Sequence, residues 1–320
     1  MGLFTRRSFV KSTSAALALT AIPGGRAIAQ DGDKPTIVVG SLNYTEQFIL
    51  AQMMALKLEE AGYPVERKLN LGGTAVGHEA LVNGEIDMYP EYTGSALAAI
   101  LNLEEPETEM ATASATPAGT SLENDPVYQL VKAEYAEQFD LEWLPPFGFN
   151  NTWAMCVTDE TAAELGLEKT SDLEPHAGDM TLGTDQEFPI RPDGLPGFED
   201  AYGFGFGDVT AGEIGLMYSA LDNGDVDVIT AYTTDGRIPE LGLTILEDDL
   251  GFFPPYHNAP VVRMDTLEES PEVREIISEL GGQITTDEMA AMNLRVDEEG
   301  VEPIDAARDF LVEQGLLGSS

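Results

Sequence analysis

Tyrosines that directly follow two similar predicted strands are the most distinctive polar residues of the sequence. Residues 80–93 read ALVNGEIDMYPEYT and residues 220–233 read ALDNGDVDVITAYT, an ungapped echo at an offset of 140 residues. Each copy has the pattern of a helix end, an Asn-Gly cap, a strand and a Tyr-Thr pair that begins at Tyr92 or Tyr232. The echo marks either two similar domains or a chance repetition of a common corner. Two domains would place both pairs beyond the carboxyl ends of parallel strands, where open sheets bind ligands, and so form an interdomain cleft.

Other side chains that could carry chemistry form no recognisable catalytic or metal-binding pattern. His78, His176 and His257 are not at metal-ligand spacing, so we expect no metal site. The sequence has no Gly-x-Ser-x-Gly motif and no phosphate-binding loop, and its carboxylates are too numerous for a catalytic pair to be singled out. The Gly-Gly-Thr segment at 72–74 could hold an anion or simply form a tight turn. We therefore predict no catalytic residue and no cofactor.

Helix and strand patterns alternate along the chain, as a parallel α/β sheet requires. Residues 36–40 and 65–69 are typical of strands, and residues 48–58 have the pattern of an amphipathic helix. Asn43 and Glu46 precede this helix at capping-box spacing. The alternation predicts βαβ units and parallel sheets.

The order of these patterns predicts two α/β domains. We expect domain I to comprise residues 34–144 and 237–318, and domain II to comprise residues 145–236. Strands predicted at 243–246 and 259–264 then belong to domain I, after the chain has crossed back.

Two segments are expected to lie outside this fold. Residues 1–29 contain a twin arginine, a short apolar run and a small-residue site, which favours a twin-arginine signal peptide over an ordinary N-terminal helix. We therefore expect export to the outer face of the cytoplasmic membrane or the cell-wall space. Residues 104–126 are acidic and rich in Ala, Thr, Ser and Pro, which predicts a flexible surface insertion.

Charge and cysteine content exclude several classes of partner. The chain has 16 Lys plus Arg against 57 Asp plus Glu, a formal net charge of −41. Such a surface repels nucleic acid and anionic lipid, so we expect neither as a partner. Cys156 is the only cysteine, which leaves no disulfide within the chain, and its apolar neighbours predict a buried core residue.

Six motifs occur in order along the chain: GSLNYTEQ at 40–47, LGGT at 71–74, YPEYTG at 89–94, RPDG at 191–194, AYTTD at 231–235 and PPY at 254–256. Together they resemble the motifs of the substrate-binding proteins of glycine betaine/choline-type osmoprotectant ABC importers. The resemblance covers about residues 36 to 315. It implies a two-domain, hinged fold of the periplasmic-binding-protein type II class, with a membrane permease and its ATPase as partners.

The resemblance also implies an aromatic box around a trimethylammonium group. Tyr92, Tyr232 and Tyr256 match the family's box tyrosines, and Trp153 stands where the archaeal betaine binders that we compare have tyrosine. Asn151 matches an acidic residue that can assist the box. A quaternary ammonium has no N–H to donate, but aromatic faces attract it by roughly 0.5–2 kcal/mol each. Half-buried packing is the alternative for any one of these rings taken alone.

The residues expected at the ligand's anionic end are fewer. Arg191 and Ser95 match positions that hold a ligand carboxylate, and an arginine fork can bind two oxygens at once. Leu42 occupies a position where many relatives carry lysine, so Arg191 is left as the main cation. This departure weakens the case for betaine itself and leaves room for choline, carnitine, proline betaine or another quaternary amine.

We interpret the chain as a non-enzymatic binding protein that delivers a betaine-like solute to an ABC permease. Two alternatives remain open. One is an exported sensory module that reports a quaternary amine to a membrane receptor. The other is an exported enzyme acting on a small cationic metabolite, which would require a nucleophile or metal that the sequence does not reveal.

The charge balance predicts that the protein works in concentrated salt, as in halophilic archaea. Self-repulsion destabilises the folded state at low ionic strength, whereas in molar salt the Debye length falls to about 3 Å and the repulsion is screened. The melting temperature, followed by circular dichroism, should therefore rise between dilute buffer and molar KCl. An unchanged melting temperature would contradict this prediction.

Overall fold

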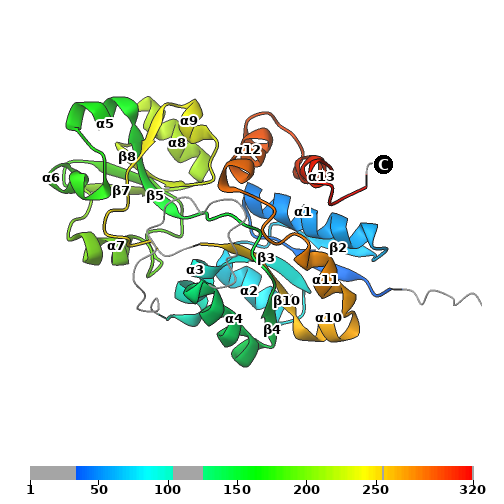
Figure 1. Cartoon of the computed structure of the whole chain (residues 1–320). Helices are drawn as coiled ribbons and strands as arrows, with labels where there is room; N and C mark the ends of the chain where they lie inside the picture. The colour runs from blue at the N-terminus through cyan, green and yellow to red at the C-terminus, as the bar shows by residue number, and fades with distance from the viewer. Residues whose placement is uncertain (1–33, 104–124, 254–255, 319–320) are drawn as a thin grey trace, which may run out of the picture. The chain divides into compact units, whose positions relative to one another are not determined.

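The computed structural model describes residues 34–103, 125–253 and 256–318. In these ranges the strands form two five-stranded sheets (Figure 1). The predicted signal peptide lies outside the described residues, and so does the predicted insertion apart from its last two residues, which start a helix. No helix in the described ranges is long and apolar enough to cross a membrane.

The first sheet combines early strands with one from the last third of the chain. Its strands are β1 (Ile37–Gly40), β2 (Val65–Lys68), β3 (Met88–Tyr92), β4 (Leu141–Trp143) and β10 (Asn258–Arg263). They lie in the order β2-β1-β3-β10-β4. β1 runs parallel to β2 and β3, as the βαβ pattern predicted, whereas β10 runs antiparallel to β3 and β4.

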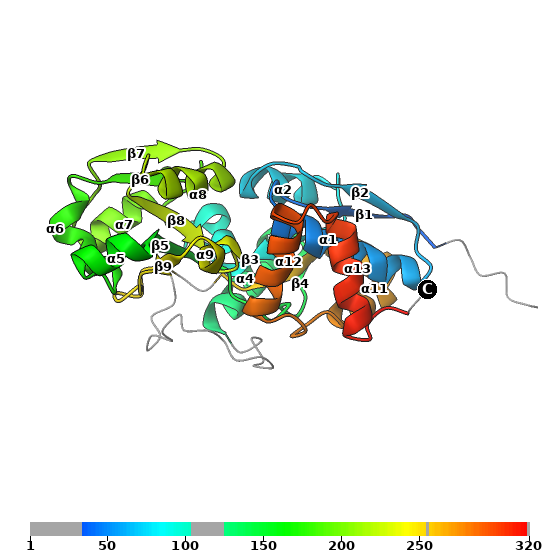
Figure 2. The same ribbon diagram turned by 90° about the horizontal axis from the view of Figure 1, so that it is seen from above.

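Helix α1 (Thr45–Glu60) is buried along most of its length. It contacts the first sheet and also α11 (Glu272–Ser278), α12 (Thr286–Asp297) and α13 (Pro303–Glu313), so both of its faces are covered (Figure 2). The predicted amphipathic pattern is therefore wrong in one respect, because no broad face of this helix meets solvent. The predicted capping box is also wrong: Tyr44 is the N-cap and makes no side-chain capping bond, which leaves Glu46 available for other partners.

The second sheet is built from the middle of the chain. Its strands are β5 (Trp153–Thr158), β6 (Thr181–Thr184), β7 (Asp208–Ala211), β8 (Val228–Tyr232) and β9 (Leu243–Ile245). They lie in the order β7-β6-β8-β5-β9. β6 runs parallel to β7 and β8, and β5 runs antiparallel to β8 and β9.

The sequence echo corresponds to an equivalent unit in each sheet. Helix α2 (Thr74–Val82) leads into β3, and helix α8 (Ile214–Asn223) leads into β8. β3 and β8 are the central strands of their sheets. Each has a parallel neighbour on one side, β1 or β6, and an antiparallel neighbour on the other, β10 or β5. The echo is therefore structural and not a chance repetition, and it places Tyr92 and Tyr232 at equivalent strand ends.

The strand at 243–245 differs from the sequence-based expectation. We predicted it in domain I, but β9 pairs with β5 and so belongs to the second sheet. Backbone pairing with the edge of β5 determines the position of β9. Its three residues are buried, partly buried and exposed in turn, and this pattern does not indicate which sheet the strand joins. The chain returns to the first sheet only with β10.

Further helices complete the fold around these sheets. They are α3 (Thr93–Ser95), the π-helix η1 (Ala96–Leu101), α4 (Pro126–Phe139), α5 (Asp159–Leu165), the 3-10 helix η3 (Thr170–Leu173), α6 (Glu174–Ala177), α7 (Leu195–Tyr202), α9 (Arg237–Glu240) and α10 (Met264–Glu269). Helix α4 covers β4, where the ring of Trp143 lies 6.4 Å from that of Tyr128 and 5.4 Å from that of Tyr135. Cys156 is buried in β5, as predicted.

A buried carboxyl in β3 gives the folded state a specific dependence on pH. Burial raises the pKa of Glu91 from 4.5 to about 7, although the Tyr89 hydroxyl donates to it at 2.5 Å and the Tyr92 backbone N–H at 2.7 Å. A raised folded-state pKa means that the folded protein holds this proton more tightly than the unfolded chain. Stability from Glu91 is therefore fully present below about pH 4.5 and is lost as pH rises through about 7.

Replacing Glu91 with glutamine should remove this loss of folding stability at high pH. We expect the free energy of unfolding of Glu91→Gln, relative to the wild type, to increase by about 2–3 kcal/mol between about pH 5 and pH 8. Urea unfolding at both pH values in molar KCl measures the difference. Because both proteins share all other carboxylates, a difference independent of pH would contradict the assignment.

Candidate ligand-binding site

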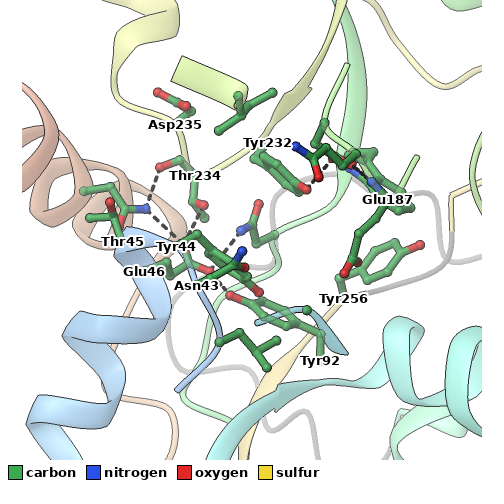
Figure 3. Close-up of a pocket in the computed structure, with 18 of the residues that line it drawn as sticks. Asn43, Tyr44, Thr45, Glu46, Tyr92, Glu187, Tyr232, Thr234, Asp235 and Tyr256 are labelled. Atoms are coloured by element: carbon green, nitrogen blue, oxygen red, sulfur yellow. Dashed lines mark hydrogen bonds between the residues drawn. The ribbon is translucent and has the colours of Figure 1, made fainter. Parts of the chain in front are cut away.

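A cavity of about 310 Å³ lies among residues that follow strands of both sheets (Figure 3). It brings together every residue that the sequence predicted for ligand binding. These are Leu42, Tyr92, Ser95, Asn151, Trp153, Arg191, Tyr232 and Tyr256. Their shared position fits the predicted box, and their contact with a ligand stays a prediction.

The aromatic rings form two groups on the walls of this cavity. The ring centroid of Trp153 lies 6.2 Å from that of Tyr232 and 5.8 Å from that of Tyr256. Tyr92 stacks on Tyr44, with centroids 6.3 Å apart and planes at 29°. Tyr44 is a fifth aromatic residue of the lining that the sequence analysis did not select, although it lies inside the first family motif.

Tyr256 depends on a glycine for its position. A Cβ on Gly94 would stand 2.6 Å from the Cε1 atom of Tyr256, closer than side-chain contacts allow. The Tyr-Thr-Gly motif therefore contributes both a ring and the space for another ring, which comes from the segment before β10.

The polar ends of all four predicted box rings donate to carboxylates that the sequence analysis did not select. The Tyr92 hydroxyl donates to Glu46, and the Tyr256 hydroxyl donates to Asp193 at 2.6 Å. Asp185 accepts from Trp153 Nε1 at 3.0 Å and from the Tyr232 hydroxyl at 2.6 Å. These bonds satisfy the buried donors, fix the ring orientations and place negative charge at the polar edges of the rings.

Glu46 connects four separate segments of the chain. Besides the bond from Tyr92, it accepts from Asn151 Nδ2 at 2.9 Å, from Thr234 Oγ1 at 2.6 Å and from Asn293 Nδ2 at 3.0 Å. Burial raises the pKa of Glu46, and the four donated bonds oppose that increase.

The hydrogen bond to Glu46 favours an amide at position 151, where the resemblance implied an acidic residue. An aspartate at this position would place a second carboxylate about 3 Å from Glu46, where two like charges repel. Asparagine supplies an N–H donor instead, so Glu46 carries the negative charge on this side of the cavity.

Arg191 is held by an acidic partner from its own turn. Its Nε and Nη2 atoms donate to the two oxygens of Asp193 at 2.8 and 2.5 Å, and its guanidinium carbon lies 4.7 Å from the Trp153 ring centroid. Nη1 reaches Ser95 Oγ and Glu187 Oε2, both at 3.2 Å. The fork predicted for a ligand carboxylate is thus occupied on one edge by Asp193, and its other edge donates to Ser95 and Glu187.

The lining carries an excess of negative charge. Its carboxylates are Glu46, Asp185, Glu187, Glu213, Asp235 and Asp297, against the guanidinium groups of Arg191 and Arg237. Arg237 is paired with Asp235 at 2.5 Å. Leu42 adds no charge: it is buried, and a Cβ on Gly77 would stand 2.4 Å from its Cδ2 atom. The cavity therefore favours a ligand with a positive charge and apolar surface.

Known proteins with similar sequences and structures share this architecture. The model of the substrate-binding domain of ABC-type glycine betaine transport systems matches residues 35–313. The glycine-betaine-binding protein of Pseudomonas aeruginosa is 35% identical over 88% of this chain and 89% of its own length. A crystal structure described as a glycine betaine/carnitine/choline ABC transporter has a TM-score of 0.71 and 33% identity, covering 88% of this chain and 99% of that one.

A third relative is a longer protein. The ergothioneine transport permease/ergothioneine binding protein EgtU of Helicobacter pylori is 32% identical over 89% of this chain, but the chain spans only 48% of that protein's length. The names of all these relatives describe binding or transport proteins. The expected periplasmic-binding-protein-like α/β fold is confirmed, and the chain belongs to the family of substrate-binding domains of ABC-type glycine betaine transport systems.

Proposed function

We propose that this protein captures a quaternary-ammonium solute, such as glycine betaine or choline, between the rings of its cavity. The observation that carries the proposal is the set of aromatic residues whose donors all bond to carboxylates. The faces of rings whose polar edges donate to carboxylates attract a cation that cannot donate hydrogen bonds, and the enclosed site strengthens this attraction by excluding water.

Arg191 and Ser95 are the residues for a ligand's carboxylate, if it has one. Their hydrogen bond joins a turn of the second sheet to a helix that follows the first sheet. A carboxylate placed between them would replace the Ser95 and Glu187 oxygens as acceptor at Nη1 and Nη2 of the guanidinium, and would also accept from the serine hydroxyl. Because Asp193 already neutralises much of the charge of Arg191, this end contributes less to affinity than the aromatic end.

Contacts between residues of the two sheets support a hinged, two-domain mechanism. The Thr234 hydroxyl, after β8, donates to Glu46 of α1, and a Cβ on Gly73 before α2 would stand 2.1 Å from Glu187 Oε1. A ligand that touches both walls would stabilise the arrangement in which these contacts form over one in which they are separated. The proposed domains are residues 34–144 with the segment from β10 onward, and the second-sheet segment between them, which includes β9.

The proposed role is delivery of the solute to a membrane permease driven by its ATPase. Family membership supports this role, and the proposed export by a twin-arginine signal would place the binding protein on the side from which solute is taken up. A protein that is exported in the folded state buries its carboxylates in the cytoplasm, before it crosses the membrane.

Loss of a ring should weaken binding of the cationic group. We expect Trp153→Ala and Tyr232→Ala each to raise the Kd for a trimethylammonium ligand more than tenfold, because each removes a wall of the box and a donor to Asp185. Titration calorimetry in molar KCl with glycine betaine, choline, carnitine and proline betaine measures the effect and identifies the preferred ligand. Unchanged affinity in both variants would exclude the box.

Loss of the guanidinium should separate ligands with and without a carboxylate. We expect Arg191→Ala to weaken glycine betaine much more than choline, since only betaine has an anionic group for this residue. The double variant Arg191→Ala with Asp193→Asn controls for the unpaired carboxylate that the single variant leaves behind. Equal losses for the two ligands in both variants would show that Arg191 does not meet the ligand carboxylate.

A further inference from the structure

We propose that Asp185 is a positioning residue that sets the selectivity of the cavity for a positive charge, acting through the rings of Trp153 and Tyr232. This inference rests on the proposed function. Neither the family motifs nor the sequence pattern selects Asp185, which directly follows β6.

The two oxygens of Asp185 have separate partners. Oδ1 accepts from the backbone N–H groups of Glu187 at 2.7 Å and Phe188 at 2.8 Å, which fixes the carboxylate relative to the turn. Oδ2 accepts from Trp153 Nε1 at 3.0 Å and from the Tyr232 hydroxyl at 2.6 Å. Each carboxylate oxygen has two acceptor sites, so these four bonds use the full capacity of the group.

The register of the second sheet makes this arrangement possible. Trp153 and Tyr232 are directly opposite each other in the antiparallel pair of β5 and β8, so their side chains project from the same face of the sheet. Their ring planes are inclined at 34° with centroids 6.2 Å apart. One anchored oxygen therefore orients two neighbouring rings of the box at once.

A charge in this position acts differently on cations and on neutral molecules. A carboxylate that accepts from an indole N–H and a phenol O–H shifts electron density toward both rings, which makes their faces more attractive to a cation. Its own charge adds a Coulomb attraction that a site with little water screens weakly. A neutral ligand of the same shape gains neither contribution, although it packs against the same rings.

Asp185→Asn removes the charge and keeps much of the geometry. The amide oxygen can still accept from the backbone N–H groups of residues 187 and 188, while the amide nitrogen replaces the acceptor that faces the rings. The Tyr232 hydroxyl can rotate to accept from this nitrogen, whereas Trp153 loses its acceptor.

The experiment compares a cation with its carbon isostere. The probes are choline with 3,3-dimethylbutan-1-ol, and glycine betaine with 3,3-dimethylbutanoate, in which carbon replaces the quaternary nitrogen. Ligand-observed NMR in molar KCl gives the Kd of each probe. For the better-bound cation, we expect Asp185→Asn to raise the Kd more than tenfold and to change that of the isostere less than twofold.

Asp248→Asn is the matched control. Asp248 accepts from the Tyr202 hydroxyl at 2.5 Å and from the backbone N–H groups of Phe252 at 3.0 Å and Phe253 at 2.9 Å, and it does not line the cavity. It therefore reproduces the chemistry of Asp185 away from the ligand. We expect its variant to lose a similar amount of thermal stability without any change in the ratio of the two Kd values.

Tyr232→Phe tests the same mechanism without altering the carboxylate. It keeps the ring and removes the donor, so it should lower the preference for the cation in the wild-type background and have little further effect beside Asp185→Asn. This single variant decides the question if Asp185→Asn does not fold.

The outcomes separate the inference from the proposed function. A wild type that binds neither cation, or that prefers the isosteres, overturns both. A wild type that prefers the cation overturns the inference alone if Asp185→Asn weakens both probes equally, or if neither Asp185→Asn nor Tyr232→Phe changes the preference.

Discussion

The structure of the site depends on the burial of one carboxylate, Glu46, with four hydrogen-bond donors. An isolated charge in this position would cost several kcal/mol, so the arrangement requires all its donors to be in place. Those donors come from the end of β3, from the segment before β5, from the segment after β8 and from α12. Displacing any one of these segments leaves a buried carboxylate short of a partner, which couples the two sheets at the cavity.

The other three rings of the proposed box also donate hydrogen bonds to carboxylates. Asp185 and Asp193 serve Trp153, Tyr232 and Tyr256 as Glu46 serves Tyr92, so each ring is held at its polar edge and left open at its face. These hydrogen bonds restrict the rotation of each ring before a ligand binds. Less side-chain conformational entropy is therefore lost on binding. The carboxylates that hold the rings in place therefore also supply negative charge close to the proposed site of the cation.

The sequence predicted the strand ends and the rings, because both depend on local patterns. Alternation of helix and strand placed Tyr92 and Tyr232 at the ends of central strands, and the family resemblance selected Trp153, Tyr256 and Arg191. The supporting carboxylates were missed for a physical reason. With 57 acidic residues, no pattern distinguishes Asp185 from a solvated neighbour. Glu46 matched the spacing of a capping box, and its partners in the structure left no local pattern because they are 46 to 247 residues away along the chain. The place of β9 likewise depends on pairing at a sheet edge, which its three residues do not encode.

The two tryptophans of the chain occupy contrasting surroundings. Trp143 is fully buried behind α4, against two tyrosine rings of that helix, whereas Trp153 lines the cavity and lies against a guanidinium and a carboxylate. Intrinsic fluorescence therefore contains one component from the wall of the cavity and one from the core of the first sheet. If the proposed ligand binds between the rings, the first component becomes an optical probe of binding and the second an internal reference, with no label needed for either.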